Sequence, residues 1–157
     1  MQSLLNSFRF AFDGLRYALA TQRNLRIHLT AAALALWMGQ RWGLSPAEWA
    51  VLWLCIGLVL AAELVNTALE AAVDLLSPGQ HPLAAAAKDT AASAVLVCAL
   101  AALGVGLGLF WRPAVFREIL ALPRQLVIPA AILAVGVWAV FGLPYAPKRT
   151  TKQKEQE

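Results

Sequence analysis

Charged residues are scarce in this chain of 157 residues: 14% are charged, whereas 60% are hydrophobic. A soluble domain carries about 25% charged residues, so this composition excludes an ordinary soluble fold. The apolar residues gather in blocks of about 17–22, which is the length that a helix needs to cross a bilayer. The composition therefore predicts an all-α integral membrane protein built as one small domain.

Cysteine is also scarce, and other familiar signals are missing. Cys55 and Cys98 both lie within apolar segments, and we interpret them as inert small hydrophobic side chains rather than as a disulfide or metal pair. The chain lacks the motif G-x-x-x-x-G-K-[ST], which excludes a phosphate-binding loop of that type. We expect no cleavable signal peptide, because residues 1–26 carry four arginines and no clean apolar run.

Four apolar segments are long enough to cross a membrane. Before them, residues 1–26 have the pattern of an amphipathic helix that lies in the membrane interface, with a plain soluble helix as the alternative. Ser45, Pro46 and Glu48 have the order of a helix start with a capping box. The predicted spans are residues 27–43, 46–76, 89–111 and 125–143, the last within a linker-and-span segment over 112–143 that precedes a polar, disordered tail over 144–157.

Basic residues indicate which side of the membrane each loop occupies. Residues 1–26 hold four arginines against one aspartate, and the tail holds four lysines or arginines. The loop over 40–48 has only Arg41. By the positive-inside rule, both termini and the loop over 77–88 are cytoplasmic. The three arginines of residues 112–124 fit this topology less well.

Residues 49–62 carry no charge at all, and a stripe of polar side chains follows them. Glu63, Asn66, Glu70 and Asp74 fall within about 80° of one helix face. Acidic groups on a membrane helix are costly, so we interpret them as functional. Carboxylates and an amide near a membrane surface suit a divalent cation and a proton-accepting base. We call these four residues the polar stripe.

Further polar residues follow the polar stripe around one short turn, namely His81, Lys88 and Asp89. Acids together with a lysine on a basic membrane surface suggest phosphoryl transfer from a nucleotide. That reaction needs a divalent cation, cationic groups for the developing charge and a base for the attacking hydroxyl. Without a Gly-rich loop, nucleotide binding must come from helix ends and side chains.

The spacing Glu63-x-x-Asn66-x-x-x-Glu70-x-x-x-Asp74, with Ala87-Lys88-Asp89 after it, resembles the prokaryotic diacylglycerol kinase and undecaprenol kinase family. Gly14-Leu15 and Arg23-Asn24-x-x-Ile27-His28 match its N-terminal pattern, so the resemblance covers about residues 5–111. It implies a lipid-kinase domain over residues 1–111 in the bacterial inner membrane, with its active site facing the cytoplasm. It also implies a homotrimer, a lipid alcohol as acceptor, ATP as donor and Mg²⁺ as cofactor, and we expect no nucleic-acid partner.

The resemblance also implies a role for each site residue. Glu63 is the general base for the lipid hydroxyl, Asn66 orients it, and Glu70 binds the metal ion that bridges the ATP phosphates. His81, Lys88 and Asp89 bind the nucleotide, and Asp74 supports the site. Arg23 and Asn24, together with Glu63, lie at the lipid substrate. The forms of the Arg23-Asn24 and Ala87-Lys88-Asp89 motifs favour undecaprenol over diacylglycerol.

One position departs from the family pattern. The family usually has a glutamate just before its Arg-Asn pair, where it helps to hold the metal, and this chain has Gln22. A neutral amide is a weaker ligand for a hard cation. The resemblance still places Gln22 opposite Glu70, at the metal and the nucleotide. Either Glu70 and the phosphates hold Mg²⁺ with fewer protein charges, or the metal affinity is lower, or another acid such as Asp13 fills the position.

Each polar residue also has a structural alternative. Glu63 can bond to a neighbouring helix, Lys88 can extend to the membrane boundary, and Asp74 and His81 can simply be solvated. The alternative for the whole chain is a non-catalytic or ion- or proton-conducting membrane protein, because intramembrane acids also mark ion paths. Against it, the chain shows no convincing inverted repeat, and the acids gather at one surface.

Overall fold

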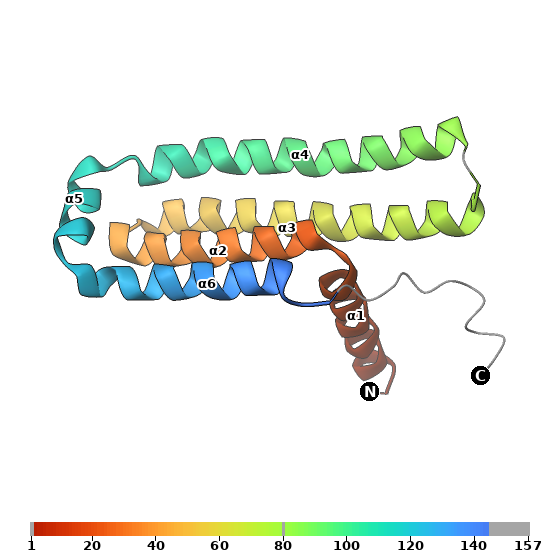
Figure 1. The fold of residues 1–157 in the computed structure, drawn as a ribbon, viewed down its shortest axis with the longest axis horizontal. Coiled ribbons are helices and arrows are strands. Elements are labelled where there is room, and N and C mark those ends of the chain that lie inside the picture. The colour runs from red at the N-terminus through yellow and green to blue at the C-terminus, as the bar shows by residue number, and fades with distance from the viewer. Residues whose placement is uncertain (1, 80, 145–157) are drawn as a thin grey trace.

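The computed structural model describes residues 2–79 and 81–144, and within them every regular element is a helix. This confirms the all-α prediction. The long α-helices run side by side in an elongated bundle, while α1 projects away from it (Figure 1). The elements are α1 (Gln2–Thr21), α2 (Arg23–Trp42), α3 (Pro46–Leu76), α4 (Pro82–Phe110), α5 (Pro113–Ala121), the 3₁₀ turn η1 (Pro123–Leu126) and α6 (Val127–Phe141).

Three of the four predicted spans have the length and composition of membrane helices. Within the described residues these are α3, α4 and the stretch Pro123–Phe141 that contains α6. The predicted span over 27–43 corresponds to α2, which is not among them, because the polar residues of its first turns lower its hydropathy. α2 nevertheless packs against α3 and α6 inside the bundle (Figure 1).

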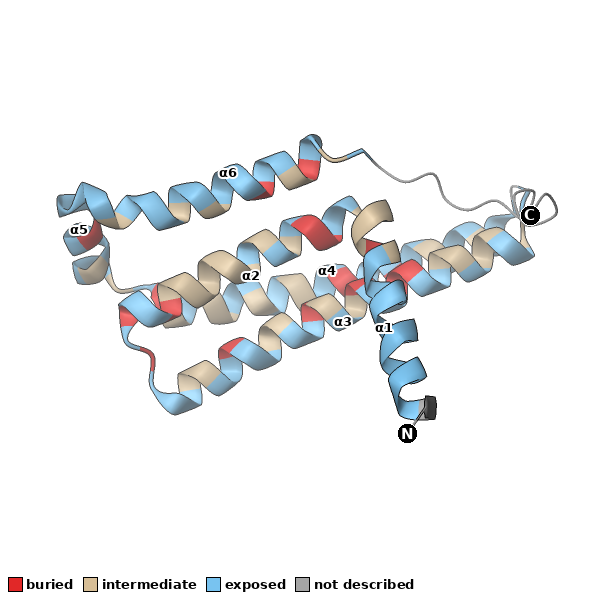
Figure 2. Cartoon of the chain, turned by 90° about the horizontal axis from the view of Figure 1, so that it is seen from below, coloured by how far each residue is buried: buried red, intermediate tan, exposed pale blue. Residues whose placement is uncertain are grey.

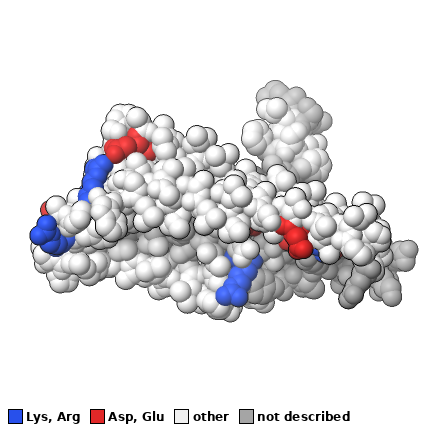
Figure 3. Space-filling view, turned by 90° about the horizontal axis from the view of Figure 1, so that it is seen from above, with Lys and Arg blue, Asp and Glu red and all other residues white. Residues whose placement is uncertain are grey.

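The outer faces of the bundle are apolar and exposed, as a protein in contact with lipid requires. Figure 2 shows exposed positions along the length of each long helix, and Figure 3 shows few charged side chains on the face that it presents. The exposed large apolar side chains include Trp53, Leu54 and Leu58 of α3 and Leu96, Val97 and Leu100 of α4. Lipid contact accounts for a surface that would be unstable in water.

The boundary between the surface helix and the first span differs from the prediction. The surface helix was expected to run to residue 26, but α1 ends at Thr21 and α2 begins at Arg23. Between them Gln22 is extended, with φ −110° and ψ 113°, which breaks the helix. α4 begins at Pro82, which occupies the first helical position after the cap His81, so residues 83–88 are helical ahead of the predicted span over 89–111, as the sequence allows.

The end of the bundle remote from α1 holds a small apolar core. It comprises Trp42, Leu44, Leu52, Phe110 and Ile119, which come from α2, α3, α4, α5 and the turn before α3. The predicted cap is present there. The Ser45 hydroxyl accepts a hydrogen bond from the Glu48 amide, and the Glu48 carboxylate accepts one from the Ser45 amide.

The segment after α4 contains more structure than the predicted linker. α5 crosses the end of the bundle and returns the chain through η1 into α6, which packs against α2 (Figure 1). The sequence of α5 mixes apolar and charged residues, so its short helix was not anticipated. Of the predicted disordered tail, residues 145–157 lie outside the described residues.

Candidate functional site

The polar stripe of α3 faces the inside of the molecule. Glu63 is only 1% exposed and Asn66 7%, while Glu70 and Asp74, one and two turns further along, are partly exposed. Thr67 is buried beside them, and its hydroxyl donates to the Glu63 carbonyl at 2.8 Å. The stripe therefore runs from a fully buried carboxylate to two partly exposed acids.

The Glu70 carboxylate lies between two side-chain amides. Asn66 Nδ2 donates to Glu70 Oε1 at 3.1 Å, and Gln22 Nε2 donates to Glu70 Oε2 at 3.3 Å. The second contact joins the break between α1 and α2 to the stripe. The predicted proximity of Gln22 and Glu70 is thus confirmed. Because both amide groups give their NH₂ to Glu70, their carbonyl oxygens are turned away from it.

The Glu63 carboxylate lies against a histidine of the neighbouring helix. His28 Nε2 of α2 is 3.2 Å from Glu63 Oε1, and the imidazole is partly exposed. The approach lacks the geometry of a hydrogen bond, so within the described residues Glu63 Oε1 accepts none. Asn66 Oδ1 is likewise buried without a hydrogen bond there. A folded protein rarely leaves such acceptors unsatisfied, and a ligand that brings donors or a cation would resolve both.

Gln22, His28, Glu63, Asn66 and Glu70 therefore form one group, which we call the polar cluster. His28 was not among the predicted site residues, although it closes the Arg23-Asn24-x-x-Ile27-His28 motif. One signal for it was available. A histidine early in an apolar helix is costly without a partner, and Glu63 was the deepest acid to offer one.

Asp74 and Lys88 form an ion pair between α3 and α4. The ion pair joins the last turn of α3 to the second turn of α4, on either side of the connecting loop. Both side chains are partly exposed. Asp74 is thus paired with a cation, while its supporting role at the site stays a prediction. Binding of a nucleotide by Lys88 stays a prediction.

The remaining predicted residues lie around the polar cluster rather than in it. His81 is exposed, and its Nδ1 accepts from the Leu83 amide at 3.2 Å as the cap of α4. Asp89 is exposed beside Lys88. Arg23 and Asn24 are exposed at the start of α2, and the Arg23 guanidinium lies 4.7 Å from the centre of the Phe141 ring.

The residues around Glu70 have the chemistry of a magnesium site that is completed by substrate. No group of three histidine, cysteine or acidic side chains suited to a metal occurs in the described part of the chain. Mg²⁺, however, is commonly held by one or two carboxylates together with substrate phosphates and water. The Glu70 carboxylate and the buried, unbonded Asn66 Oδ1 are hard oxygen donors of that kind.

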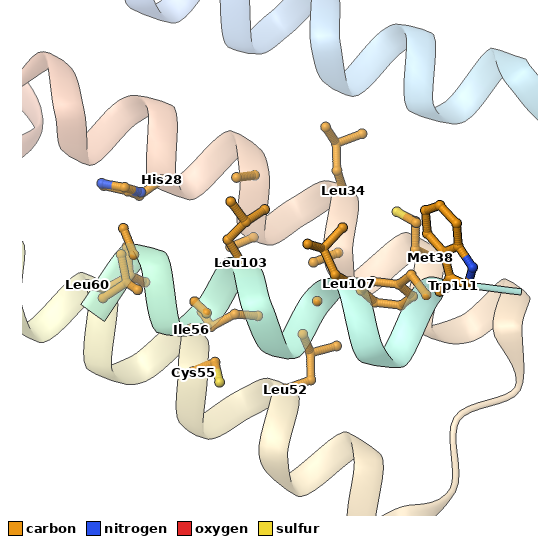
Figure 4. Close-up of a pocket in the computed structure, with 18 of the residues that line it drawn as sticks. His28, Leu34, Met38, Leu52, Cys55, Ile56, Leu60, Leu103, Leu107 and Trp111 are labelled. Atoms are coloured by element: carbon orange, nitrogen blue, oxygen red, sulfur yellow. The ribbon is translucent and has the colours of Figure 1, made fainter. Parts of the chain in front are cut away.

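An apolar cavity of about 570 Å³ begins at the polar cluster. Figure 4 shows His28 at one end of it and Trp111 at the other, with Leu103 and Ile56 between them. The cavity lies between α2, α3 and α4, and His28 supplies almost its only polar group. It is thus an apolar channel that runs along the spans and ends beside the Glu63 carboxylate.

The comparisons with known proteins agree with these features. The family model described as prokaryotic diacylglycerol kinase matches residues 9–110. A diacylglycerol kinase of Synechocystis sp. is 48% identical over 105 residues, 66% of this chain and 60% of that protein. An undecaprenol kinase of Bacillus subtilis is 41% identical over 110 residues, 70% of this chain and 89% of that protein. A diacylglycerol kinase of Helicobacter pylori is 33% identical over 94 residues, 60% of this chain and 73% of that protein.

The matched region has two limits. This chain spans less than two thirds of the length of the Synechocystis relative. The family match ends at residue 110, so it includes α2, α3, α4 and most of α1 but neither α5 nor α6. No solved structure matches the chain.

Proposed function

This chain belongs to the prokaryotic diacylglycerol kinase family, whose named relatives are lipid kinases, and on that premise we propose that it phosphorylates a membrane lipid alcohol with ATP. The helices that could cross a membrane make it a multi-pass membrane protein. We place it in the bacterial inner membrane with the polar cluster toward the cytoplasm, where ATP is available. The basic residues of α1 support this orientation.

The observation that carries the proposal is that the apolar cavity ends at the polar cluster. The cavity can hold a hydrocarbon chain, and a hydroxyl at the end of that chain would lie beside His28 and Glu63. Glu70 lies about two turns beyond Glu63, where the polar stripe becomes partly exposed. A lipid and a soluble nucleotide could therefore approach the same stripe from opposite directions.

In the proposed reaction, the Glu63 carboxylate accepts the proton of the lipid hydroxyl. The lipid oxygen then bonds to the γ-phosphorus of ATP, the bond from that phosphorus to the β–γ bridging oxygen breaks, and ADP leaves with the electron pair. His28 holds Glu63 in place, at 3.2 Å. Asn66 positions the reacting groups with its free Oδ1. A positioned base of this kind contributes about 10²–10⁴-fold to a rate.

Glu70 would hold Mg²⁺, and Asn66 and Gln22 would join it if their amide groups turned their carbonyl oxygens toward the ion in place of the NH₂ groups that now bond to Glu70. A bound Mg²⁺ would supply positive charge to offset the negative charge of the nucleotide phosphates. Lys88 and Asp89 lie toward the nucleotide, and Asp74 holds Lys88 there through their ion pair. A homotrimer, as the family resemblance implies, would bring further residues from neighbouring copies to this end of the bundle.

Two lipids are candidates for the substrate, namely diacylglycerol and undecaprenol, because the relatives are named after one or the other. We propose undecaprenol, because the match to the undecaprenol kinase of B. subtilis covers 89% of that protein, and because the Arg23-Asn24 and Ala87-Lys88-Asp89 motifs of this chain favour that lipid. The test is transfer of labelled γ-phosphate to lipid by the purified chain in vesicles that contain either undecaprenol or diacylglycerol. Faster labelling of undecaprenol supports the proposal, faster labelling of diacylglycerol reverses the choice of lipid, and no labelling of either overturns the kinase assignment.

A further inference from the structure

The C-terminal helix α6 lies outside the region matched by the family, yet it is joined to the corner that carries Gln22. The connection is made by Arg26, which is only 5% exposed. Its guanidinium donates to backbone carbonyls at the ends of two different helices. The acceptors are the Leu19 (2.6 Å) and Ala20 (3.1 Å) carbonyls in the last turn of α1, the Ala139 carbonyl (2.9 Å) in the last turn of α6, and the Leu143 carbonyl (3.4 Å) just after α6.

The chemistry of these contacts is that of a cation at helix C-termini. The last carbonyls of a helix lack intrahelical partners and carry the negative end of its dipole. α1 ends at Thr21 because Gln22 is extended, which leaves the Leu19 and Ala20 carbonyls in this position. α6 ends at Phe141. One buried guanidinium therefore holds the negative ends of α1 and α6 together.

α6 also packs tightly on the first turns of α2. Gly136 is buried against Thr30, and a Cβ at this position would overlap the Thr30 side chain. The Thr30 hydroxyl donates to the Arg26 carbonyl at 2.9 Å. Phe141 lies under the Arg23 guanidinium. These contacts fix α6 along the segment of α2 that directly follows Gln22.

Gln22 depends on this corner for its position. It is the single extended residue between α1 and α2, and its amide reaches Glu70 across the bundle at 3.3 Å. A neutral amide draws no ionic attraction toward a metal, so its place beside Glu70 must come from the packing of the backbone on both sides. That packing is what Arg26 and α6 supply.

We propose that α6 is a positioning element for the active site: through Arg26 it holds the α1–α2 corner closed, and so keeps Gln22 on Glu70. In this role α6 touches no reacting group. Loosening α6 should leave the helices of the matched region folded but release the corner. The kinetic part of the proposal rests on the proposed lipid-kinase function, whereas the structural part does not.

The structural test is backbone hydrogen exchange of the full chain in lipid nanodiscs. Gly136→Leu forces α6 away from Thr30, and we expect amides of residues 18–25 to exchange about tenfold faster or more. Ala134→Leu is the matched control, because Ala134 is an exposed residue of the same helix. Unchanged exchange at the corner in Gly136→Leu would overturn the proposal, whatever reaction the protein catalyses.

A second variant covers the case in which Gly136→Leu does not fold. Arg26→Lys keeps the charge but loses the planar fork that reaches both helix ends, so it should also speed exchange at residues 18–25. In the phosphate-transfer assay, both variants should raise the Mg²⁺ concentration for half-maximal rate severalfold while kcat at saturating Mg²⁺ stays within about twofold. A fall in kcat alone, with exchange at the corner unchanged, would show that α6 serves only general stability.

Discussion

Both halves of α3 carry acidic side chains, but these side chains differ in whether their oxygens have hydrogen-bond partners. Near its start, both carboxylate oxygens of Glu48 have partners, one in the capping box with Ser45 and one with Arg112 at 2.7 Å. Arg112 also donates to the Trp42 carbonyl at 2.9 Å. In the second half of the helix, Glu63 Oε1 and Asn66 Oδ1 are buried without a hydrogen bond from the described residues.

The presence or absence of hydrogen-bond partners distinguishes structural polar residues from candidate site residues better than residue type does. Satisfied polar groups at a helix end hold that end in place, as the Ser45–Glu48 cap and Arg112 do. Buried acceptors without donors destabilise the fold unless something else binds them. The start of α3 thus holds neighbouring helices together, and we propose that the polar cluster is a ligand-binding site.

Replacement of Glu63 should have the largest effect. Glu63→Gln keeps the shape of the side chain but removes the base, so kcat for phosphoryl transfer should fall about 10²–10⁴-fold. ATP binding should survive, because Glu63 lies at the buried end of the polar stripe, about two turns from Glu70. The measurements are steady-state phosphate transfer and equilibrium binding of ATP. A near-normal kcat would show that Glu63 is not the base.

Replacement of Glu70 should act on the metal instead. Glu70→Ala removes the carboxylate that accepts hydrogen bonds from Gln22 and Asn66, and the Mg²⁺ concentration for half-maximal rate should rise about tenfold or more. High Mg²⁺ should restore part of the rate. Lys88→Ala should raise the KM for ATP. Glu118→Ala, an exposed acid of α5, is the control and should change neither quantity.

Unchanged dependence on Mg²⁺ and on ATP in both Glu70→Ala and Lys88→Ala would count against this site. A loss of rate in Glu70→Ala that no Mg²⁺ concentration relieves would indicate that Glu70 acts in the chemical step. The Mg²⁺ titration therefore distinguishes a metal-binding role of Glu70 from a role in the chemical step.

His28 should have an intermediate effect, because it touches the base and not the phosphates. Loss of its contact with Glu63 lets the carboxylate move, and kcat in His28→Ala should fall about tenfold. His28→Gln, which keeps a donor, should recover part of the loss, whereas His28→Leu should not. The KM for ATP should stay constant throughout, and a rise in that KM would place His28 with the nucleotide.

The smallest effect is expected at the position that departs from the family. Gln22→Glu brings a second carboxylate beside Glu70, and two acids hold a divalent cation more strongly than an acid and an amide. The midpoint of a Mg²⁺ titration at saturating ATP should fall a few-fold. If the midpoint stays fixed and only the ATP requirement rises, Gln22 contacts a phosphate rather than the metal.

The sequence predicted the features that depend on local patterns. The apolar blocks gave three spans, and the order Ser45, Pro46, Glu48 gave the cap. The resemblance placed Gln22 opposite Glu70. The break at Gln22 was missed, because the amphipathic pattern continues across it without a proline or glycine.

What escaped prediction depends on packing between distant segments. The contact of His28 with Glu63 requires the relative rotation of α2 and α3, which no spacing within one helix reveals. Arg26 binds backbone carbonyls of α1 and α6, and carbonyls leave no mark in a sequence. For this reason residues 125–143 were predicted only as an additional span.

The most direct test of the contrast between the two ends of α3 compares Glu63→Gln with Glu48→Gln in one preparation of undecaprenol vesicles. Each change replaces one carboxylate of α3 with an amide of nearly the same size. With kcat expressed per folded molecule, we predict that Glu63→Gln loses at least about a hundredfold, whereas Glu48→Gln stays within about twofold and only melts at a lower temperature. Equal losses of kcat in the two variants would contradict the account.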